Sequence, residues 1–291
     1  LIDLFKNVPY RLACTATPAP NDPEELTNQA AFLGRATRQE MLSTYYIHDG
    51  LNTQSWRLKG HAHGPLMEWM SQWAVAIKRP SDIGGDDGGF ILPELVVDVD
   101  TVPWRGSAPD GELFRADIGG VGGRAHVRRD SLDDRVRKTV DLVMGEPDQQ
   151  WIVWCGLNEE ASRVAKAVPG AVDVNGSMSA EEKAQSFLDF ADGKIQVLVT
   201  KSQMAAFGLN WQNCARMAFC GINDSWELYY QSVRRCWRFG QKRPVHVHIV
   251  CSTLESTIAE NIARKERQAT SLSDELVSAM SRRQLISRKA A

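Results

Sequence analysis

The sequence lacks the features that mark membrane, secreted or metal-binding proteins. No apolar run reaches the roughly 20 residues that span a bilayer, and no signal peptide opens the chain. Its six cysteines form no Cys-x-x-Cys pair and mostly lie in apolar runs. We therefore expect buried free thiols in a reducing compartment rather than a zinc site or a disulfide framework. These absences predict a cytoplasmic protein with no metal ligands and no membrane partner.

The chain has no large net charge, because its 34 basic and 36 acidic residues give a net charge of −2. Any nucleic-acid surface would therefore have to be a local patch. The 291 residues, 43% of them hydrophobic, are enough for one large or two ordinary domains. The chain begins at Leu1 rather than at a methionine, and a structural pattern is already under way there. We expect it to be a piece of a longer protein.

Residues 1–34 predict one strand and one helix. The apolar run near residues 10–14 predicts the strand, and Asp22 and Pro23 then begin a helix that Gly34 ends. One strand and one helix cannot bury a core alone, so this stretch predicts the end of a domain.

Residues 35–135 predict a mixed, largely helical insert. Apolar residues recur at helical spacing from Leu66 onward and include Trp69 and Trp73. We expect these two tryptophans to be core residues rather than a base-stacking platform. The run "FILPELVVDVDTV" predicts a strand in the same stretch.

Residues 136–270 alternate between strand and helix. Predicted helices begin at Asn158, after the Ser179 capping box and after Ser225. The predicted strands are 151–155, 171–176, 195–200, 215–220 and 245–250. This alternation is typical of an α/β fold whose parallel sheet carries helices on both faces. Residues 271–291 predict a helical tail.

The stretch from 231 to 243, "QSVRRCWRFGQKR", carries five basic residues and no acidic one. At about 100° per residue on a helix, Gln231, Arg235 and Arg238 share one face, and apolar residues occupy the opposite face. We expect this basic face to point away from the sheet, so that removing its arginines opens no core cavity. A solvated surface would have this pattern too. The nearby loop at 201–213, however, follows a strand, where α/β sheets build ligand sites, and paired guanidinium groups suit phosphate.

Four segments together resemble the motifs of superfamily-2 helicases. "LACTATPAPND" resembles motif III, "WIVWCGLNEEASRVAKAV" motif IV, "VLVTKSQMAAFGLN" motif V and "QSVRRCWRFGQKRPV" motif VI. Their order and spacing are similar to those of the Swi/Snf-like branch, and within it to helicases of phages and prophages. The resemblance covers residues 1–34 and about 136–262.

The resemblance implies a domain plan and a set of site residues. Residues 1–34 would end a first RecA-like domain, 35–135 would be a Swi/Snf-type insert, and 136–270 would be the second RecA-like, helicase C-terminal domain. ATP would bind between the two RecA-like domains, with Arg235 and Arg238 as arginine fingers. The other implied positions are catalytic Gln231; nucleotide-binding Gly208, Asn210 and Gln241; and DNA-binding or coupling Thr15, Thr17, Gly156, Asn175, Thr200 and Lys201.

The 291 residues contain neither a Gly-x-x-x-x-Gly-Lys-Ser/Thr loop nor an Asp-Glu-x-His box. The resemblance implies that both lie ahead of Leu1, in a first RecA-like domain that holds most of the ATP and Mg²⁺ contacts. If the protein is phage-derived, it would act in the cytoplasm of the bacterial host.

Two functions stay open at this point. The first is the second motor portion of an ATP-dependent DNA helicase or translocase, with duplex DNA and the first RecA-like domain as partners. The second is a catalytically inactive nucleic-acid-binding or regulatory module with the same fold.

Overall fold

The computed structural model describes residues 1–290 except 21, 50–51, 105–126, 206–207 and 223–224. The described chain divides into two compact units. One comprises Leu1–Gly88 together with Arg264–Ala291, and the other comprises Gly89–Ala263.

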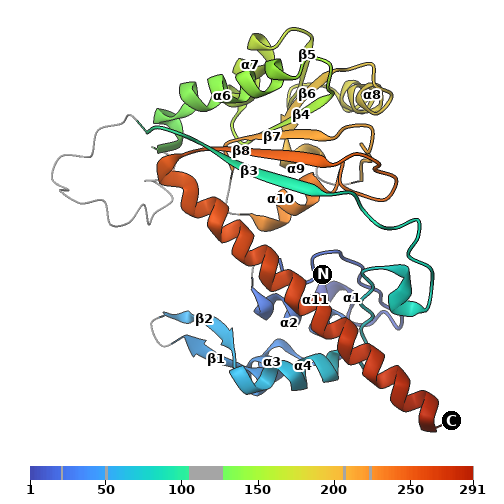
Figure 1. The fold of residues 1–291 in the computed structure, drawn as a ribbon. Helices are drawn as coiled ribbons and strands as arrows, with labels where there is room; N and C mark the ends of the chain where they lie inside the picture. Colours follow the sequence, from blue (N-terminus) through green and yellow to red (C-terminus); the bar gives the residue numbers. More distant parts are fainter. Residues whose placement is uncertain (21, 50–51, 105–126, 206–207, 223–224, 291) are drawn as a thin grey trace. The chain divides into compact units, whose positions relative to one another are not determined.

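The first unit is mostly helical and contains one β-hairpin. The two strands of the hairpin are antiparallel (Figure 1). Its elements are α1 (Ile2–Phe5), η1 (Pro23–Glu25), α2 (Leu26–Phe32), α3 (Arg38–Tyr45), β1 (Tyr46–Asp49), β2 (Asn52–Leu58), η2 (Gly60–Ala62), α4 (His63–Met70), η3 (Pro80–Ile83) and, from Arg264 on, α11 (Ser256–Ala290).

The core of this unit joins α2, α3, α4 and α11. Leu26, Leu66 and Met70 are buried in it together with Leu276 and neighbouring residues of α11. Trp69 and Trp73 pack edge-to-face with their ring centroids 5.1 Å apart, and both are partly buried against this cluster. The two rings therefore pack against a core, as expected, but both stay partly exposed rather than buried. The helix α4 is shorter than the apolar pattern suggested.

The strand predicted near residues 10–14 is wrong. These residues adopt no regular secondary structure, and Tyr10 and Leu12 are 91% and 83% exposed. The helix expected after it does form, and Gly34, at a φ of +67°, follows its end as predicted.

The second unit is an α/β domain built on a six-stranded sheet. All of its strand pairs are parallel, in the order β3-β8-β7-β4-β6-β5. The strands are β3 (Leu95–Val102), β4 (Trp151–Cys155), β5 (Ala171–Val174), β6 (Val197–Lys201), β7 (Arg216–Cys220) and β8 (Val245–Ser252). The helices are α6 (Leu132–Gly145), α7 (Asn158–Ala167), α8 (Ala180–Ala191), α9 (Ser202–Ala205) and α10 (Trp226–Val233), and η4 (Thr253–Glu255) leads into α11.

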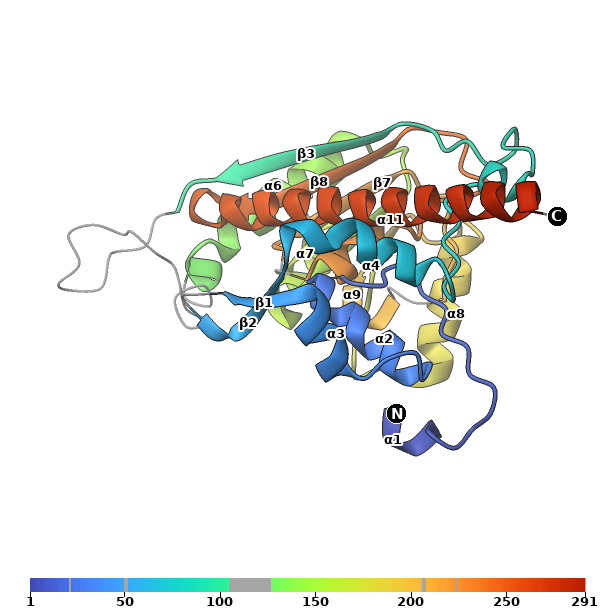
Figure 2. The same cartoon turned by 90° about the horizontal axis from the view of Figure 1, so that it is seen from below.

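The sheet includes a strand, β3, that lies outside residues 136–270, where the sequence predicted all of the sheet's strands. It pairs with β8 along its whole length, from Leu95 opposite Val245 to Val102 opposite Ser252, and runs beside β8 in both views (Figures 1 and 2). The stretch 35–135, predicted as a largely helical insert, thus supplies an edge strand of this sheet.

Helices cover both faces of the sheet, as the strand–helix alternation predicted. One face buries Val153, Val199 and Ala218 against α6 and α7. On the other face, Trp154 and Trp211 have ring centroids 6.1 Å apart, and Trp211 contacts α8 through Phe187 and Phe190. Because successive side chains of a strand point to opposite faces, the apolar runs of β4, β6 and β7 supply both layers.

Candidate functional site

The turn that follows α10 carries the arginines, and the helix does not. α10 ends at Val233. The amides of Arg235 and Cys236 then bond three residues back, to Ser232 and Val233 at 3.1 Å each, which tightens the chain into turns. The prediction that Gln231, Arg235 and Arg238 share one face of a helix is therefore wrong, because the helix ends before both arginines.

The turn nevertheless brings Gln231, Arg235 and Arg238 together. Arg235 donates from Nε to the Gln231 carbonyl at 3.0 Å and from Nη2 to Gln231 Oε1 at 3.3 Å. Both arginines also donate through Nη1 to one acceptor, the Leu209 carbonyl, at 2.7 Å from Arg235 and 3.2 Å from Arg238. In return, the Trp211 amide donates to the Arg235 carbonyl at 2.8 Å. The β6–β7 connection and the arginine turn therefore form one hydrogen-bonded structure.

The two arginines differ in burial. Arg235 is only 8% exposed, whereas Arg238 is intermediate. Burial lowers the pKa of the Arg235 guanidinium, and the nearby positive charge of Arg238 lowers it further. The expectation that removing Arg235 would leave the interior intact is wrong, because its guanidinium is a structural partner of Gln231 and Leu209.

Of the three positions implied to bind nucleotide, two are exposed and one is buried and hydrogen-bonded within the protein. Gly208 has a φ of +78°, which favours glycine, and no described residue other than its chain neighbours lies within 4 Å of the Cβ position. Asn210 is exposed. Gln241 is buried. Its side-chain Nε2 donates to the carbonyls of Cys214 and Cys236, and its Oε1 accepts from the backbone amides of residues 242 and 243. The Gln241 side chain thus holds the turn after the arginines in place.

Several coupling positions also have local structural partners. Thr200 is fully buried and donates from Oγ1 to the Val174 carbonyl at 3.0 Å, which ties β6 to β5. Asn175 closes the turn after β5, accepting from the Ser177 amide at 3.1 Å. In the other unit, Thr15 Oγ1 accepts from the Thr17 amide at 3.0 Å.

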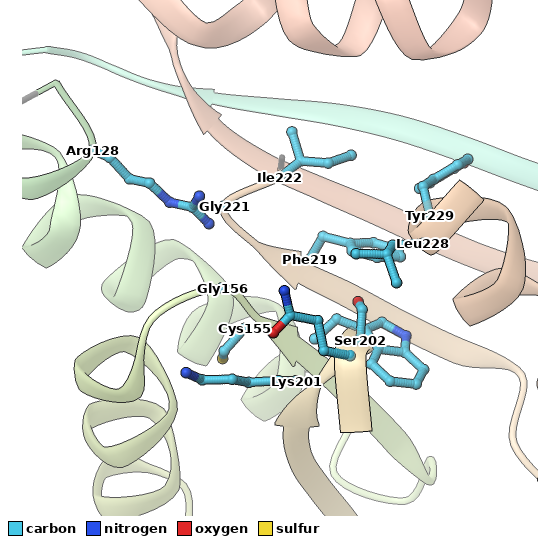
Figure 3. A pocket seen from close by; sticks show the side chains of 12 residues that line it. Arg128, Cys155, Gly156, Lys201, Ser202, Phe219, Gly221, Ile222, Leu228 and Tyr229 are labelled. Carbon is cyan, nitrogen blue, oxygen red and sulfur yellow. The ribbon is translucent and has the colours of Figure 1, made fainter. Parts of the chain in front are cut away.

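A pocket lies at the carboxyl ends of β4, β6 and β7 (Figure 3). Gly156 and Lys201 line it, and so does Arg128, which precedes α6 and which no motif had identified. Residues of β4, α9, β7 and α10 also line it, among them Trp154, Phe219 and Tyr229. The structure therefore brings two predicted DNA-binding positions together with one cation that the sequence analysis missed.

A buried ion pair lies beside this pocket. Arg135 and Glu160 are both 0% exposed at their side chains, and Arg135 Nη1 is 2.6 Å from Glu160 Oε1. Burial alone would lower the pKa of Arg135, but the Glu160 carboxylate outweighs burial and the pKa is raised. The other oxygen of Glu160 accepts from the amides of Gly156 and Leu157 at 2.8 and 2.9 Å. The buried Glu160 carboxylate thus holds the loop after β4 in place through its backbone amides.

Metal centres and membrane spans are absent from the residues that the structure describes. Among them, no three His, Cys, Asp or Glu side chains gather in a way that could hold a metal ion. Within the same residues, no helix has the length and apolarity that a membrane span needs. The cysteines there are all free; five are buried, and Cys14 is exposed.

Comparison with known proteins locates a family segment in this unit. Residues 134–240 match the family model described as "Helicase conserved C-terminal domain". The segment runs from α6 to the turn that holds Arg235 and Arg238, and the six-stranded parallel sheet is consistent with a RecA-like helicase C-terminal domain.

The remaining comparisons are weaker. No curated protein matches the chain. Among solved structures, the chain is similar to the "Crystal structure of the C-terminal part of Fun30 ATPase domain", at 12% sequence identity and a TM-score of 0.40. The match covers 53% of this chain and 55% of that one, so the chain spans about half the length of that structure.

Proposed function

We propose that Gly89–Ala263 acts as the second RecA-like domain of an ATP-dependent DNA helicase or translocase. The observation that carries this proposal is the pairing of Arg235 and Arg238 on the Leu209 carbonyl, inside the segment that matches the helicase C-terminal model. Two guanidinium groups on a loop next to a parallel sheet are suited to a phosphate group, because each is planar, permanently charged and rich in donors.

In this proposal the arginines stabilise the negative charge that develops on the γ-phosphoryl group of ATP. Arginine fingers of this kind accelerate phosphoryl transfer by on the order of 10³ to 10⁵. Arg235 is largely buried and bonded to Gln231, so it serves as the fixed member of the pair. Arg238 makes only one bond to Leu209 and is more exposed, so it serves as the member that reaches the nucleotide.

The residues of this chain fit a phosphate ligand, and ATP supplies the phosphoryl group that is transferred. Mg²⁺ and most nucleotide contacts would be held by a first RecA-like domain. Gly208 and Asn210 would approach the nucleotide from the β6–β7 connection, and Gln241 would hold the arginine turn rather than contact ATP. Duplex DNA would contact the carboxyl edge of the sheet at Gly156 and Lys201.

DNA-stimulated ATP hydrolysis tests this proposal. We expect the purified 291-residue chain to be inactive, because it contains no Walker A lysine to hold the phosphates. We expect turnover from the protein in which a first RecA-like domain accompanies the chain. Measurable turnover by the chain alone would contradict this division of roles.

A further inference from the structure

The pocket at the carboxyl edge has a one-sided charge. Among the described residues that line it, Arg128 and Lys201 are cationic and none is acidic. Figure 3 shows these two side chains on either side of Gly156. Lys201 pairs with Cys155 in the sheet through its backbone, and its side chain makes no hydrogen bond or ion pair to any described residue. A lining with two cations and no carboxylate favours an anionic ligand.

Arg128 has donor capacity that its surroundings do not use. Its only described acceptor is Glu160, whose Oε1 lies 3.4 Å from Nε, and that carboxylate is already paired with Arg135 at 2.6 Å. The Nη2 atom of Arg128 is buried and has no acceptor among the described residues. An unmade hydrogen bond of a charged donor is costly, and an anionic oxygen entering from the pocket would supply the missing acceptor.

The Arg128 guanidinium fits where it does because two neighbouring residues are glycines without a side chain. A Cβ atom at Gly156 would lie 2.1 Å from Arg128 Nη2, and one at Gly221 would lie 3.0 Å from the same atom and 2.3 Å from Arg135 Nη1. The guanidinium therefore lies directly against the loop that follows β4.

Two backbone amides of the loop between β4 and α7 are already in use. Those of Gly156 and Leu157 donate to Glu160 Oε2. These two amides are therefore not available to an anion in the pocket, whose cationic contacts would come from the Arg128 and Lys201 side chains.

We propose that Arg128 and Lys201 together bind one phosphate of the nucleic-acid backbone, with Arg128 as a contact residue outside the helicase motifs. Arg128 lies ahead of the matched segment 134–240 and outside the four segments that resemble helicase motifs. This inference rests on the proposed function, because it names a further residue of the same nucleic-acid surface.

The test is binding of a fluorescein-labelled DNA duplex to the full 291-residue chain, measured by anisotropy across a range of salt concentrations. Each lost phosphate contact lowers the slope of log K against log salt by about one. Because the two side chains share one phosphate, we expect Arg128→Gln and Lys201→Gln each to lower the slope by at most that amount, and the double variant to lower it by about one in total. Each single variant should weaken low-salt binding on the order of tenfold. The matched control is Arg129→Gln, since Arg129 is exposed and outside the pocket; it should leave the slope unchanged.

A second pair of variants separates contact from folding. Gly156→Ala should displace the Arg128 guanidinium and reproduce the loss, and it should add nothing to Arg128→Gln in the double variant. Gly145→Ala is its control, because no described residue beyond its own helical turn lies within 4 Å of that Cβ position. Arg128→Lys, which keeps the charge, should retain most of the slope even if Arg128→Gln lowers the melting temperature.

The outcomes distinguish this inference from the proposed function. If the chain binds DNA with a steep salt slope that Lys201→Gln reduces but Arg128→Gln does not, the role of Arg128 is refuted and the proposed function stands. If the wild-type chain binds no DNA at low salt, both are contradicted.

Discussion

Replacing Glu160 with glutamine should destabilise the α/β unit more than any surface substitution of the same kind. The carboxylate is fully buried and accepts four hydrogen bonds, from Arg135 at 2.6 Å, Arg128 at 3.4 Å and the amides of Gly156 and Leu157 at 2.8 and 2.9 Å. A glutamine has one oxygen where glutamate has two. If that oxygen accepts from Arg135, the side-chain NH2 group faces the N–H donors of Gly156 and Leu157, and the reverse holds if the side chain turns. Arg135 would also stay buried without a counter-charge, and breaking such a pair costs about 3–5 kcal/mol.

Urea unfolding of the chain, followed by tryptophan fluorescence, measures this effect. Trp151, Trp154 and Trp211 are each about 1% exposed and all lie in this unit, so their emission reports its unfolding. With a slope of about 2 kcal/mol per molar urea, the midpoint should fall by about 2 M. The control is Glu159→Gln, which alters an exposed ion pair with Arg163 and should barely move the midpoint. Equal shifts for the two variants would refute the assignment of the buried pair as the support of this loop.

Two further predictions concern the arginine turn and the sheet. Arg235→Ala should lower the melting temperature more than Arg238→Ala, because only Arg235 bonds both Gln231 and Leu209 from a largely buried position; equal melting temperatures would contradict this. Burial alone would raise the pKa of Asp100, but hydrogen bonds from His248 and Lys138 outweigh it and hold that pKa below its ordinary value. The stability that Asp100 contributes should therefore be present above about pH 4 and be lost as the pH falls through the lowered pKa. Asp100→Asn should thus be less stable than wild type at pH 7, and a gap that persists at pH 2 would refute this explanation.

The central strands β4, β6 and β7 could be predicted because each is a short, largely apolar run between turn residues. Trp151–Cys155 and Val197–Lys201 are buried on both faces, so their sequences carry the signal without any partner. Residues 10–14 carry a similar run, yet no strand forms there, because a strand also needs a neighbour to pair with and Leu12 lies exposed.

The candidate site was only partly predictable. Periodicity grouped Gln231, Arg235 and Arg238 correctly. It could not reveal that the helix stops at Val233 or that the Leu209 carbonyl accepts from both guanidinium groups. That contact joins positions 26 and 29 residues apart. Arg128 gave no signal at all, because its partner Glu160 is 32 residues away and neither residue stands out in composition or spacing.

The most direct test of the central claim is ATP turnover by Arg238→Ala in the protein that joins this chain to a first RecA-like domain. Arg234→Ala is the matched control: Arg234 is the same residue type in the same turn, but it packs over the rings of Tyr230 and Trp237, at 5.9 and 5.2 Å from their centroids. We predict that Arg238→Ala lowers kcat by on the order of 10³ or more, changes ATP affinity much less and keeps the wild-type melting temperature, whereas Arg234→Ala retains most turnover. A folded Arg238→Ala protein that hydrolyses ATP as fast as Arg234→Ala would contradict the assignment of this arginine to the nucleotide.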